Sequence, residues 1–544
     1  MVSQILILSA YFIVILIIGF IARTKLSASP NEYFLSGRNL SGILLIGTMI
    51  ATNFSAFTVY GTSGAGYRDG YSFFPIMGFG TGFMALSFWV IGKKAWKIAK
   101  DKNLISPPEL IGELYGNRLL NIIFAFVMII FTIPYLALQP MAAGYVLQEL
   151  FGIEYFTGCI IVTAIILLYT LRGGMKAVVW TDLLQGSLMF ILLFISIILV
   201  SRHNGGFISA NRQVFHNIPI LFSRPGASGK YLPGIWLGFM ALWFFADPMF
   251  PQLFQRFFSA KNEKSLAITM LAYPAISSLI FFMPISMGVL GHLTHPGLSG
   301  KAADKIIPMM LNDIAGPNMA TLVMAAGIAA LMSTMDSQLL TLGSIFSRDI
   351  APIFGLKNRK SSIMGRIFVI ILAFLGLALA YNPPDTILAI ATEAFSGLAM
   401  LFPAIFFGLY LKKRYSMAAI LSILSGEIMV ILLHFKIITM PGVLPFLPSI
   451  AVAIIVYCLA HIMISVSRNE FELVFPRWLK NPFIIIFAGI FILANDFWRW
   501  NDSGQLWFGL PSWIFWFIGL SAVQTIAMWL MIKTNTSDVS HEAD

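Results

Sequence analysis

Charged residues are scarce in this chain, and apolar residues dominate it. Only 11% of its 544 residues are Asp, Glu, Lys or Arg, whereas 58% are hydrophobic. A soluble domain carries about 25% charged residues, so this balance excludes a soluble globular protein and indicates a membrane protein with many spans. Basic loops of a membrane protein explain the net charge of +11, so we assign no nucleic-acid partner.

Cysteine is almost absent, with only Cys159 and Cys458, both inside apolar runs. Two such residues imply neither a disulfide framework nor a metal cluster. The sequence also lacks the HExxH, GxSxG and Walker motifs, and its seven histidines form no ligand-spaced pair within a span. We therefore expect that the protein is not an enzyme.

Long apolar runs are abundant. At about 20 residues for each crossing, they predict an all-α polytopic membrane protein with about 15 transmembrane helices. The first run has no basic segment before it and no small-residue cleavage site after it, which favours a retained helix over a signal peptide. The predicted spans are 4–22, 41–66, 72–94, 119–149, 155–171, 178–200, 233–256, 268–292, 317–347, 364–381, 386–411, 416–434, 446–466, 481–499 and 511–533.

Lys and Arg gather on alternate connections between these spans, as the positive-inside rule expects of cytoplasmic loops. This pattern predicts a multi-pass protein of the plasma membrane with its N-terminus outside and its C-terminus in the cytoplasm. The long connection 201–232 would then lie outside. The basic inward positions include Lys93, Lys94, Lys97, Lys100, Lys102, Arg172, Lys176, Arg256, Lys261, Lys412 and Arg414.

The stretch 43–70 is long enough to cross a membrane but is interrupted by polar residues. Thr52, Asn53, Ser55 and Thr58 occur close together in it. Each polar group in hydrocarbon needs a partner, so this run must face protein, water or a ligand. Interrupted helices of this kind hold ions and substrates in secondary transporters, and a packing face of small residues is the alternative.

Four acidic residues fall within or at the edge of the predicted spans: Asp182, Asp247, Asp336 and Glu393. Intramembrane acids mark candidate functional sites because unpaired charge is costly there. For Asp182, near the predicted cytoplasmic start of its span, snorkelling or capping is an equal alternative. Asp247 precedes Pro248, which removes a helical hydrogen bond and predicts a second broken helix. Paired breaks in two halves of a chain indicate an inverted-repeat transporter with a midplane site.

A further polar cluster lies in the segment 325–350. It comprises Ser333, Thr334, Asp336, Ser337 and Gln338. Hard monovalent cations prefer oxygen ligands, so two adjacent hydroxyls together with carbonyls freed in the broken span 43–70 could bind one. Interhelical hydrogen bonding by Ser and Thr is the alternative reading.

Five motifs, in order, resemble the sodium:solute symporter family of sodium/proline, sodium/pantothenate and sodium/glucose carriers. The resemblance covers roughly residues 1 to 465. The motifs are NEYFLSGRNLSG (31–42), RGGMKAVVWTDLLQG (172–186), QLFQRFFSAKNEKSL (252–266), AALMSTMDSQLL (329–340) and GLAMLFPAIFFGLYLKKR (397–414).

The resemblance implies the LeuT-type fold, in which two inverted five-helix repeats are flanked by extra N- and C-terminal helices. The expected parts are an N-terminal helix and loop (1–40), the first repeat (41–200), an external loop (201–232), the second repeat (233–415), and additional C-terminal helices with a short polar tail (416–544).

The resemblance also implies a sodium site between the first and eighth core helices. Its ligands would be the carbonyls of Ala51, Phe54 and Ala330 and the hydroxyls of Ser333 and Thr334. Asp182 matches the family's acid that is associated with sodium passage on the cytoplasmic side. Asn53 stands where the proline-type carriers have Asp, which leaves one fewer formal charge beside the ion.

We therefore expect a sodium-coupled symporter of a small organic solute, working by alternating access, with sodium, the solute and the lipid bilayer as its partners. A proton-coupled transporter of the same fold, or a channel, is the alternative. The expected solute-binding residues are Asn53, Ser55, Thr58, Trp243 and Asp247. Three roles are open for Asp247: a counter-charge for a cationic solute group, a titrating proton site, or a partner for a freed backbone N–H. The solute's identity and the oligomeric state are not readable from the residues.

Overall fold

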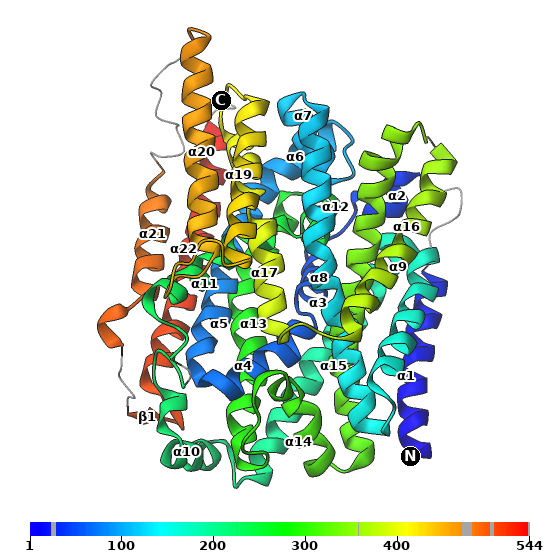
Figure 1. Ribbon diagram of the computed structural model, residues 1–544, viewed down its shortest axis with the longest axis vertical. Coiled ribbons are helices and arrows are strands. Elements are labelled where there is room, and N and C mark those ends of the chain that lie inside the picture. Colours follow the sequence, from blue (N-terminus) through cyan, green and yellow to red (C-terminus); the bar gives the residue numbers. More distant parts are fainter. Residues whose placement is uncertain (23–28, 228, 357, 471–480, 501–504, 542–544) are drawn as a thin grey trace.

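The computed structural model describes residues 1–22, 29–227, 229–356, 358–470, 481–500 and 505–541, and this part of the chain is mostly helical. Figure 1 shows the long helices standing side by side along the longest axis of the molecule. The helices of the first half are α1 (Val2–Ile21), α2 (Pro30–Leu35), α3 (Gly42–Asn53), α4 (Thr62–Asp69), α5 (Phe73–Met84), α6 (Lys94–Asp101), α7 (Pro107–Tyr115), α8 (Arg118–Phe151), α9 (Tyr155–His203) and α10 (Phe207–Asn217).

The second half continues with more helices and one small hairpin. They are α11 (Pro233–Ala246), α12 (Pro251–Ser259), α13 (Glu263–Leu290), α14 (Ile306–Ile314), α15 (Pro317–Ile345), α16 (Asn358–Tyr381), α17 (Ile387–Ala399), α18 (Phe402–Tyr410), α19 (Ser416–His434), α20 (Phe446–Ser467), α21 (Pro482–Ala494) and α22 (Ser512–His541). The strands β1 (Leu506–Trp507) and β2 (Leu510–Pro511) pair antiparallel.

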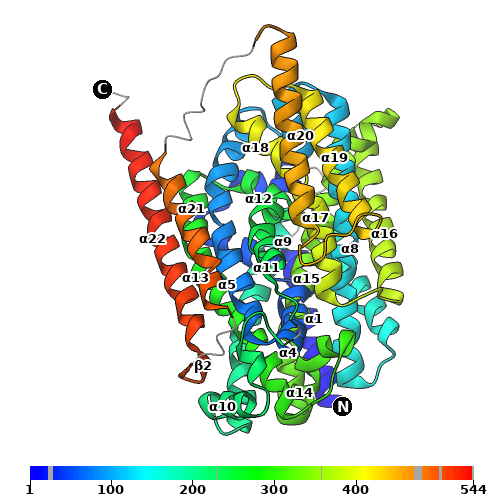
Figure 2. The same ribbon diagram turned by 60° about the vertical axis from the view of Figure 1, so that its left-hand side comes forward.

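Within the described residues, 12 helical segments are long and apolar enough to cross a membrane. The apolar helices Gly42–Asn53 and Tyr155–Leu171 are shorter. The count of about 15 spans stays a prediction, because some of the expected crossings are built from two short pieces. The helix α1 begins at one end of the molecule and α22 finishes at the other, as an odd number of crossings requires (Figures 1 and 2).

The interruption predicted in the stretch 43–70 is present. The helix α3 ends where Phe54 adopts extended backbone angles of φ −87° and ψ 92°, and the π-helical stretch Phe57–Gly61 leads from there into α4. Side chains satisfy backbone groups that the break frees. The Ser55 hydroxyl accepts from the Phe57 N–H at 3.2 Å, and the Thr58 hydroxyl accepts from the Ser55 N–H at 3.2 Å.

The second break, predicted from Pro248, is also present. After α11 the chain makes a 3₁₀ turn over Asp247–Met249, and Phe250 is extended with ψ 123° before α12 begins at Pro251. Pro248 and Pro251 have no N–H to donate, so neither can continue the hydrogen-bond pattern of a preceding helix. The local sequence therefore favours this break, whereas Pro134 and Pro140 lie inside the continuous helix α8, so a proline alone does not impose one.

The helix α15 lies in the interior of the bundle and packs against α3, α8 and α9. The helix α9 combines two predicted spans, 155–171 and 178–200, which meet at a kink. Gly174 has φ 65° and ψ −176° at that kink, a conformation that favours glycine. The two spans are therefore separate helical segments of one element.

The C-terminal helices lie on the outside of the bundle, with α21 and α22 beside α5 and α13 (Figure 2). One buried ion pair anchors the turn after α21, because the Arg224 guanidinium binds both carboxylate oxygens of Asp496. The rings of Trp236, Trp513 and Phe517 surround that guanidinium at 5.1 to 5.7 Å. Arg224 belongs to the connection 201–232, which we predicted as an external loop, and its side chain is nevertheless fully buried.

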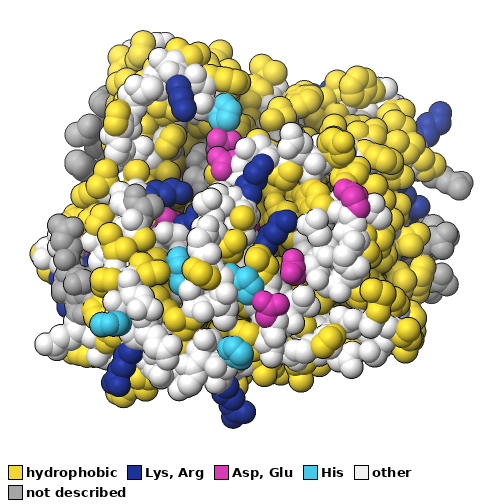
Figure 3. All heavy atoms as spheres, turned by 60° about the horizontal axis from the view of Figure 1, so that its bottom comes forward, with side chains coloured by type: hydrophobic (Ala, Val, Ile, Leu, Met, Phe, Trp, Pro, Cys, Tyr) yellow, Lys and Arg dark blue, Asp and Glu magenta, His cyan; other side chains and the backbone are white. Residues whose placement is uncertain are grey.

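Figure 3 views the end face of the molecule that carries α10 and α14. Basic, acidic and histidine side chains are interspersed there among neutral polar groups. Hydrophobic side chains form more continuous cover along the flanks. This distribution is typical of a protein whose flanks contact lipid and whose ends contact water.

Candidate functional site

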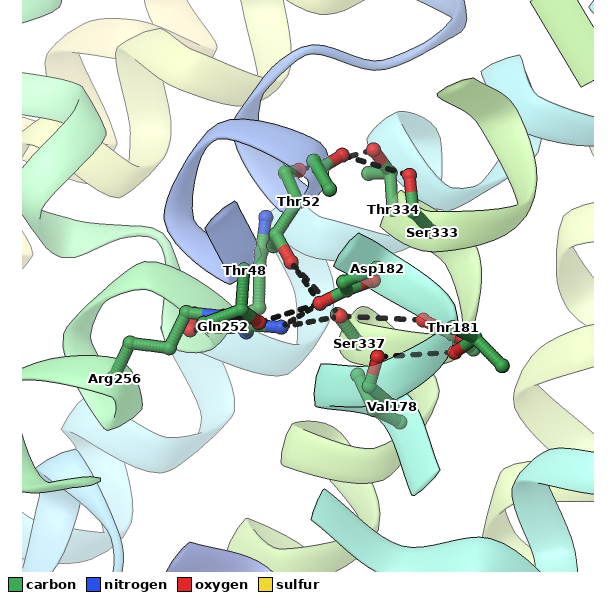
Figure 4. A network of polar contacts seen from close by, with 12 residues as sticks. Thr48, Thr52, Val178, Thr181, Asp182, Gln252, Arg256, Ser333, Thr334 and Ser337 are labelled. Atoms are coloured by element: carbon green, nitrogen blue, oxygen red, sulfur yellow. Dashed lines mark hydrogen bonds and ion pairs between the residues drawn. The ribbon is translucent and has the colours of Figure 1, made fainter. Parts of the chain in front are cut away.

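Polar side chains of α15 contact the broken end of α3 in the interior of the bundle. The Ser333 hydroxyl donates to the Ala51 carbonyl at 2.7 Å, and the Thr334 hydroxyl donates to the Thr52 carbonyl at 2.9 Å (Figure 4). Both hydroxyls also lie within hydrogen-bond distance of the Ala330 carbonyl, at 3.0 and 3.2 Å. The structure thus brings carbonyl and hydroxyl oxygens of two different helices to one place.

Of the five expected sodium ligands, these contacts join Ala51, Ala330, Ser333 and Thr334. The fifth, Phe54, ends α3, and its ψ of 92° turns its carbonyl away from the helical direction. All five residues are buried. The five groups are neutral oxygens, a donor set that suits a hard monovalent cation.

Asp182 lies beside this cluster in a fully buried ion pair with Arg256, with 2.9 Å between Oδ2 and Nη2 (Figure 4). The same oxygen accepts from the Thr48 hydroxyl at 2.5 Å and from the Thr52 hydroxyl at 3.3 Å. Arg256 donates in addition to Ser337 at 2.7 Å and to the Thr48 hydroxyl at 2.9 Å. The network therefore connects α3, α9, α12 and α15.

These contacts exclude the snorkelling or capping role that the sequence left open for Asp182, and its role on the ion pathway stays a prediction. A snorkelling or capping carboxylate would reach an exposed surface or a helix N-terminus, whereas both Asp182 and Arg256 have no exposed side-chain surface. Among the described residues, Oδ1 of Asp182 has no hydrogen-bond partner. Thr52 links this carboxylate to the cluster on α15, since its hydroxyl binds Asp182 and its carbonyl binds Thr334.

Glu393, by contrast, does not lie in the interior of the bundle. Its side chain is 63% exposed, and one carboxylate oxygen lies 3.1 Å from Nδ1 of His434. The sequence placed Glu393 within or at the edge of a predicted span and assigned it no role; the face of α17 that carries it points away from the interior of the bundle. It is not part of the candidate site.

A small cavity lies on the other side of the first break, between the two broken helices. Its volume is about 10 Å³, which is roughly enough for one water molecule. The cavity is lined by Asn53, Phe57, Thr58, Met77, Thr81, Tyr135, Trp243, Asp247, Phe250, Phe281 and Phe395. Among these described lining residues, Asp247 is the only carboxylic acid.

Four of the five residues expected to bind a solute line this cavity, namely Asn53, Thr58, Trp243 and Asp247. The fifth, Ser55, lies next to it, where its hydroxyl accepts from the Tyr135 hydroxyl at 3.3 Å. The two helix breaks are the reason for this convergence. Each break turns side chains that would otherwise follow a helical spiral towards one common space.

The polar groups of the cavity are only partly paired. The Asn53 side-chain amide donates to the Asp247 carboxylate at 3.3 Å and to the Tyr273 hydroxyl at 2.6 Å. Among the described residues, the Trp243 indole N–H and the Thr81 hydroxyl are buried without a hydrogen-bond partner. Unpaired buried donors are costly, so they mark positions where a ligand could bind.

Sequence reasoning missed most of the aromatic residues that enclose the cavity. The ring centroids of Tyr135 and Phe395 are 4.9 Å apart, those of Phe250 and Phe395 are 4.6 Å apart, and those of Trp243 and Phe395 are 5.6 Å apart. Tyr135 and Phe395 lie in apolar runs that contain no acidic or basic residue next to them, so composition did not single them out. Arg256, also missed as a site residue, lies in the motif QLFQRFF, which was the available signal.

On the side of α4, a polar contact holds the end of this helix in place. The Arg68 guanidinium lies 2.9 Å from a carboxylate oxygen of Asp304, whose other oxygen accepts from the Ile387 N–H at 2.9 Å. Burial raises the pKa of the Asp304 carboxyl above its usual value, and the Arg68 charge opposes this shift. A Cβ at Gly64 would overlap the Asp304 carboxylate, so glycine is required for this close approach.

Two solved structures share this arrangement of helices. One is a Na⁺-coupled sialic acid symporter in its substrate-bound outward-open state, with a TM-score of 0.69 and 17% identity over 84% of this chain and 97% of that chain. The other is Mhp1, a nucleobase-cation-symport-1 family transporter in a closed conformation, with a TM-score of 0.54 and 12% identity over 82% of this chain and 98% of that chain. The protein therefore has the LeuT-type fold of membrane symporters.

A model of the sodium:solute symporter family matches residues 33–426. The match spans more than half of the chain, so the chain belongs to the sodium:solute symporter family, which confirms the resemblance of the five motifs.

Curated relatives agree with this family. The sodium/pantothenate symporter of Haemophilus influenzae is 28% identical over 75% of this chain and 85% of its own length. That of Escherichia coli is 27% identical over 84% of this chain and 95% of its own length. The sodium/proline symporter of Staphylococcus aureus is 26% identical over 78% and 84%. The family carries out sodium-coupled solute transport, its members are transporters, and sodium is the coupling ion.

Proposed function

We propose that this protein is a plasma-membrane symporter that moves a small organic solute together with sodium by alternating access. The observation that carries the proposal is the contact of the Ser333 and Thr334 hydroxyls with the carbonyls at the broken end of α3. This contact places a set of oxygen atoms between two helices that belong to different halves of the chain. A cation bound there would hold the halves in one relative arrangement.

Sodium binding would rearrange these oxygens rather than assemble them from a distance. The two hydroxyls donate their protons to carbonyls, and they would rotate so that their lone pairs face the ion. The Ala51, Phe54 and Ala330 carbonyls would complete the ligand set. Sodium would then tighten α15 against α3, whose polar residue Asn53 lines the solute cavity. By linkage, bound solute would raise the sodium affinity by the same factor.

Asp182 would act on the ion's route to the cytoplasm. Its Oδ1 atom has no hydrogen-bond partner among the described residues, while Oδ2 is engaged by Arg256, Thr48 and Thr52. A sodium ion that leaves the cluster on α15 would meet this carboxylate through Thr52. Arg256 would compete with the ion for the same charge, so that the ion is bound only transiently.

The chemistry of the cavity favours a solute with a cationic group and an apolar part. Asp247 supplies the negative charge, Asn53, Ser55 and Thr58 supply polar contacts, and Trp243 supplies an indole N–H and an aromatic face. An amino-acid-like zwitterion meets these conditions. The cavity holds about one water in this conformation, so solute binding requires the broken helices to move apart.

The proposal also keeps the expected membrane orientation and repeat boundaries. The first repeat would span residues 41–200 and the second 233–415, each with a broken first helix. The N-terminus would lie outside and the C-terminus in the cytoplasm. On that assignment, Arg68 and Asp304 close the external side of the cavity, and this ion pair must break for a solute to enter from outside.

Uptake by the purified protein in proteoliposomes tests this function. Candidate solutes are first ranked by thermal shift, since a transported solute should stabilise the protein more in sodium than in potassium at equal ionic strength. The best solutes are then assayed for saturable, sodium-driven uptake and for counterflow. Uptake that follows a proton gradient without sodium, or flux that does not saturate and shows no counterflow, would exclude sodium symport.

A further inference from the structure

A large apolar cavity, which we call the flank cavity, lies between the transport core and the two last helices. Its volume is about 590 Å³, far more than that of the central cavity. Its lining residues belong to α5, α11 and α18 on one side and to α21 and α22 on the other. Figure 2 shows α21 and α22 at its left. The lining residues used below are Lys93, Lys94, Ala241, Phe244, Asn481 and Ala488.

The lining of the flank cavity is mostly aromatic and aliphatic. Phe83 of α5 packs on Phe244, Phe487 and Phe491 with ring centroids 5.6 to 6.3 Å apart, which joins α11 and α21 across the cavity. Side chains around an empty space of this size would lose the dispersion contacts that they make in a packed interior. We therefore expect hydrocarbon to fill the flank cavity. The volume lies within the range of about 300–1,000 Å³ that holds small organic ligands.

The membrane is the nearest source of hydrocarbon. Only 28% of the apolar segment Pro482–Arg499, which contains α21, is buried inside the protein. Ile485 and Ile492, on the same helix as Ala488, are 76% and 65% exposed. Since these residues face lipid in a membrane-spanning protein, the flank cavity lies next to the acyl chains of the bilayer.

One end of the flank cavity is basic. Lys93 and Lys94 line it, together with Asn481, at the end that the charge pattern predicts to be cytoplasmic. Nζ of Lys93 lies 3.0 Å from Oε2 of Glu263, and the Lys93 side chain is 30% exposed. Lys94 donates to the Leu409 carbonyl at 3.3 Å. Each ammonium has three donors, so both lysines keep capacity for another acceptor, and the pair outweighs the single Glu263 charge.

We propose that the flank cavity binds one anionic phospholipid of the inner leaflet. Its acyl chain fills the space between α11 and α21, and its phosphate lies between Lys93 and Lys94. Basic pockets between membrane helices on the cytoplasmic side recognise anionic headgroups by this charge complementarity. The proposal assigns a role to α21 and α22, which form one side of the site, and it does not depend on the identity of the transported solute.

The helix α11 connects the flank cavity with the central cavity. Ala241 and Phe244 of α11 contact the flank cavity, and Trp243 of the same helix lines the central cavity. A lipid tail therefore packs against the back of the second broken helix. We expect bound lipid to stabilise the arrangement in which α11 is held between α5 and α21.

The test uses the full-length protein in a neutral detergent, with phosphatidylglycerol and phosphatidylcholine of identical acyl chains as probes. Native mass spectrometry should record one tightly bound phosphatidylglycerol, with phosphatidylcholine bound at least about tenfold more weakly. The double variant Lys93→Gln and Lys94→Gln should lose this preference. Lys97→Gln is the matched control, because Lys97 is exposed on the same helical segment but does not line the cavity.

A second pair of variants tests the apolar part without changing charge. Ala488→Phe would fill the cavity and should lower the binding of both lipids, whereas Ile485→Phe places the same ring on the outward face of α21. Equal binding of the two lipids to the native protein would overturn the headgroup assignment. An equal loss of lipid with Lys97→Gln, or unchanged binding with Ala488→Phe, would show that lipid binds elsewhere on the surface.

Discussion

Replacement of both hydroxyls on α15 tests the sodium site most directly. The double variant Ser333→Ala and Thr334→Ala removes two of the five expected oxygen ligands. It leaves the carbonyl ligands of α3 in place and adds no charge. We expect the sodium concentration that gives half-maximal effect to rise at least about tenfold, which corresponds to about 1.4 kcal/mol.

The magnitude follows from the contacts. A hydrogen-bond-type contact to a charged group contributes about 1.5–3 kcal/mol, and a neutral hydrogen bond contributes about 0.5–1.5 kcal/mol. Each hydroxyl makes a neutral bond to a carbonyl of α3, at 2.7 Å for Ser333 and 2.9 Å for Thr334, and the variant loses those bonds as well. The difference is about 1–1.5 kcal/mol for each hydroxyl, so the two together weaken sodium binding by roughly 30- to 160-fold.

A thermal-shift titration with sodium chloride, at ionic strength kept constant with potassium chloride, measures this effect without a known solute. Thr321→Ala serves as the matched control, because Thr321 is a buried hydroxyl of α15 that donates only to the Pro317 carbonyl one turn earlier. The control should keep the native sodium response. A double variant that is folded by size-exclusion chromatography and still responds to sodium like the native protein would refute the site.

Three other changes give separate outcomes. Asp247→Asn should weaken binding of cationic or zwitterionic solutes by about 10- to 100-fold and leave the sodium affinity nearly unchanged in thermal-shift titrations. A loss of sodium affinity with unchanged solute affinity would instead place Asp247 on the ion pathway. Arg224→Ala should lower the free energy of unfolding by about 3–5 kcal/mol, because it leaves the buried Asp496 carboxylate without its partner. Arg212→Ala, at an exposed position of the same connection, is the control. Equal unfolding temperatures of the two variants would contradict the anchoring role. In a chain without its native cysteines, Lys97→Cys should react with an impermeant thiol reagent only from the cytoplasm and Arg212→Cys only from outside, whereas labelling from one side would refute the topology.

The broken helices could be predicted because their causes are local. Pro248 cannot donate a hydrogen bond wherever it lies, and the run from Thr52 to Thr58 is too polar for a lipid-facing helix. Both predictions are confirmed by the extended backbone at Phe54 and Phe250. The sodium ligands were inferred from family resemblance and stay a prediction; hydrogen bonds join four of these residues, Ala51, Ala330, Ser333 and Thr334.

Partners of the buried charges could not be predicted, because they lie far apart along the chain. Asp182 and Arg256 are separated by 74 positions, and Arg256 was counted among the basic residues of a loop. The aromatic enclosure of the cavity was also missed. Tyr135 and Phe395 are ordinary members of apolar runs, and only the packing of α8 against α17 brings them to the cavity.

The sequence by itself determined where the chain can cross a membrane and indicated the two breaks, since hydropathy, local polarity and the missing N–H of proline act over a few residues. Only the tertiary structure decided which polar groups meet. It buried Arg224 on Asp496, turned Glu393 outward to His434, and left an apolar cavity beside two lysines. These outcomes depend on how helices from distant parts of the chain pack, and the same residue pattern permits both a buried and an exposed position until that packing is formed.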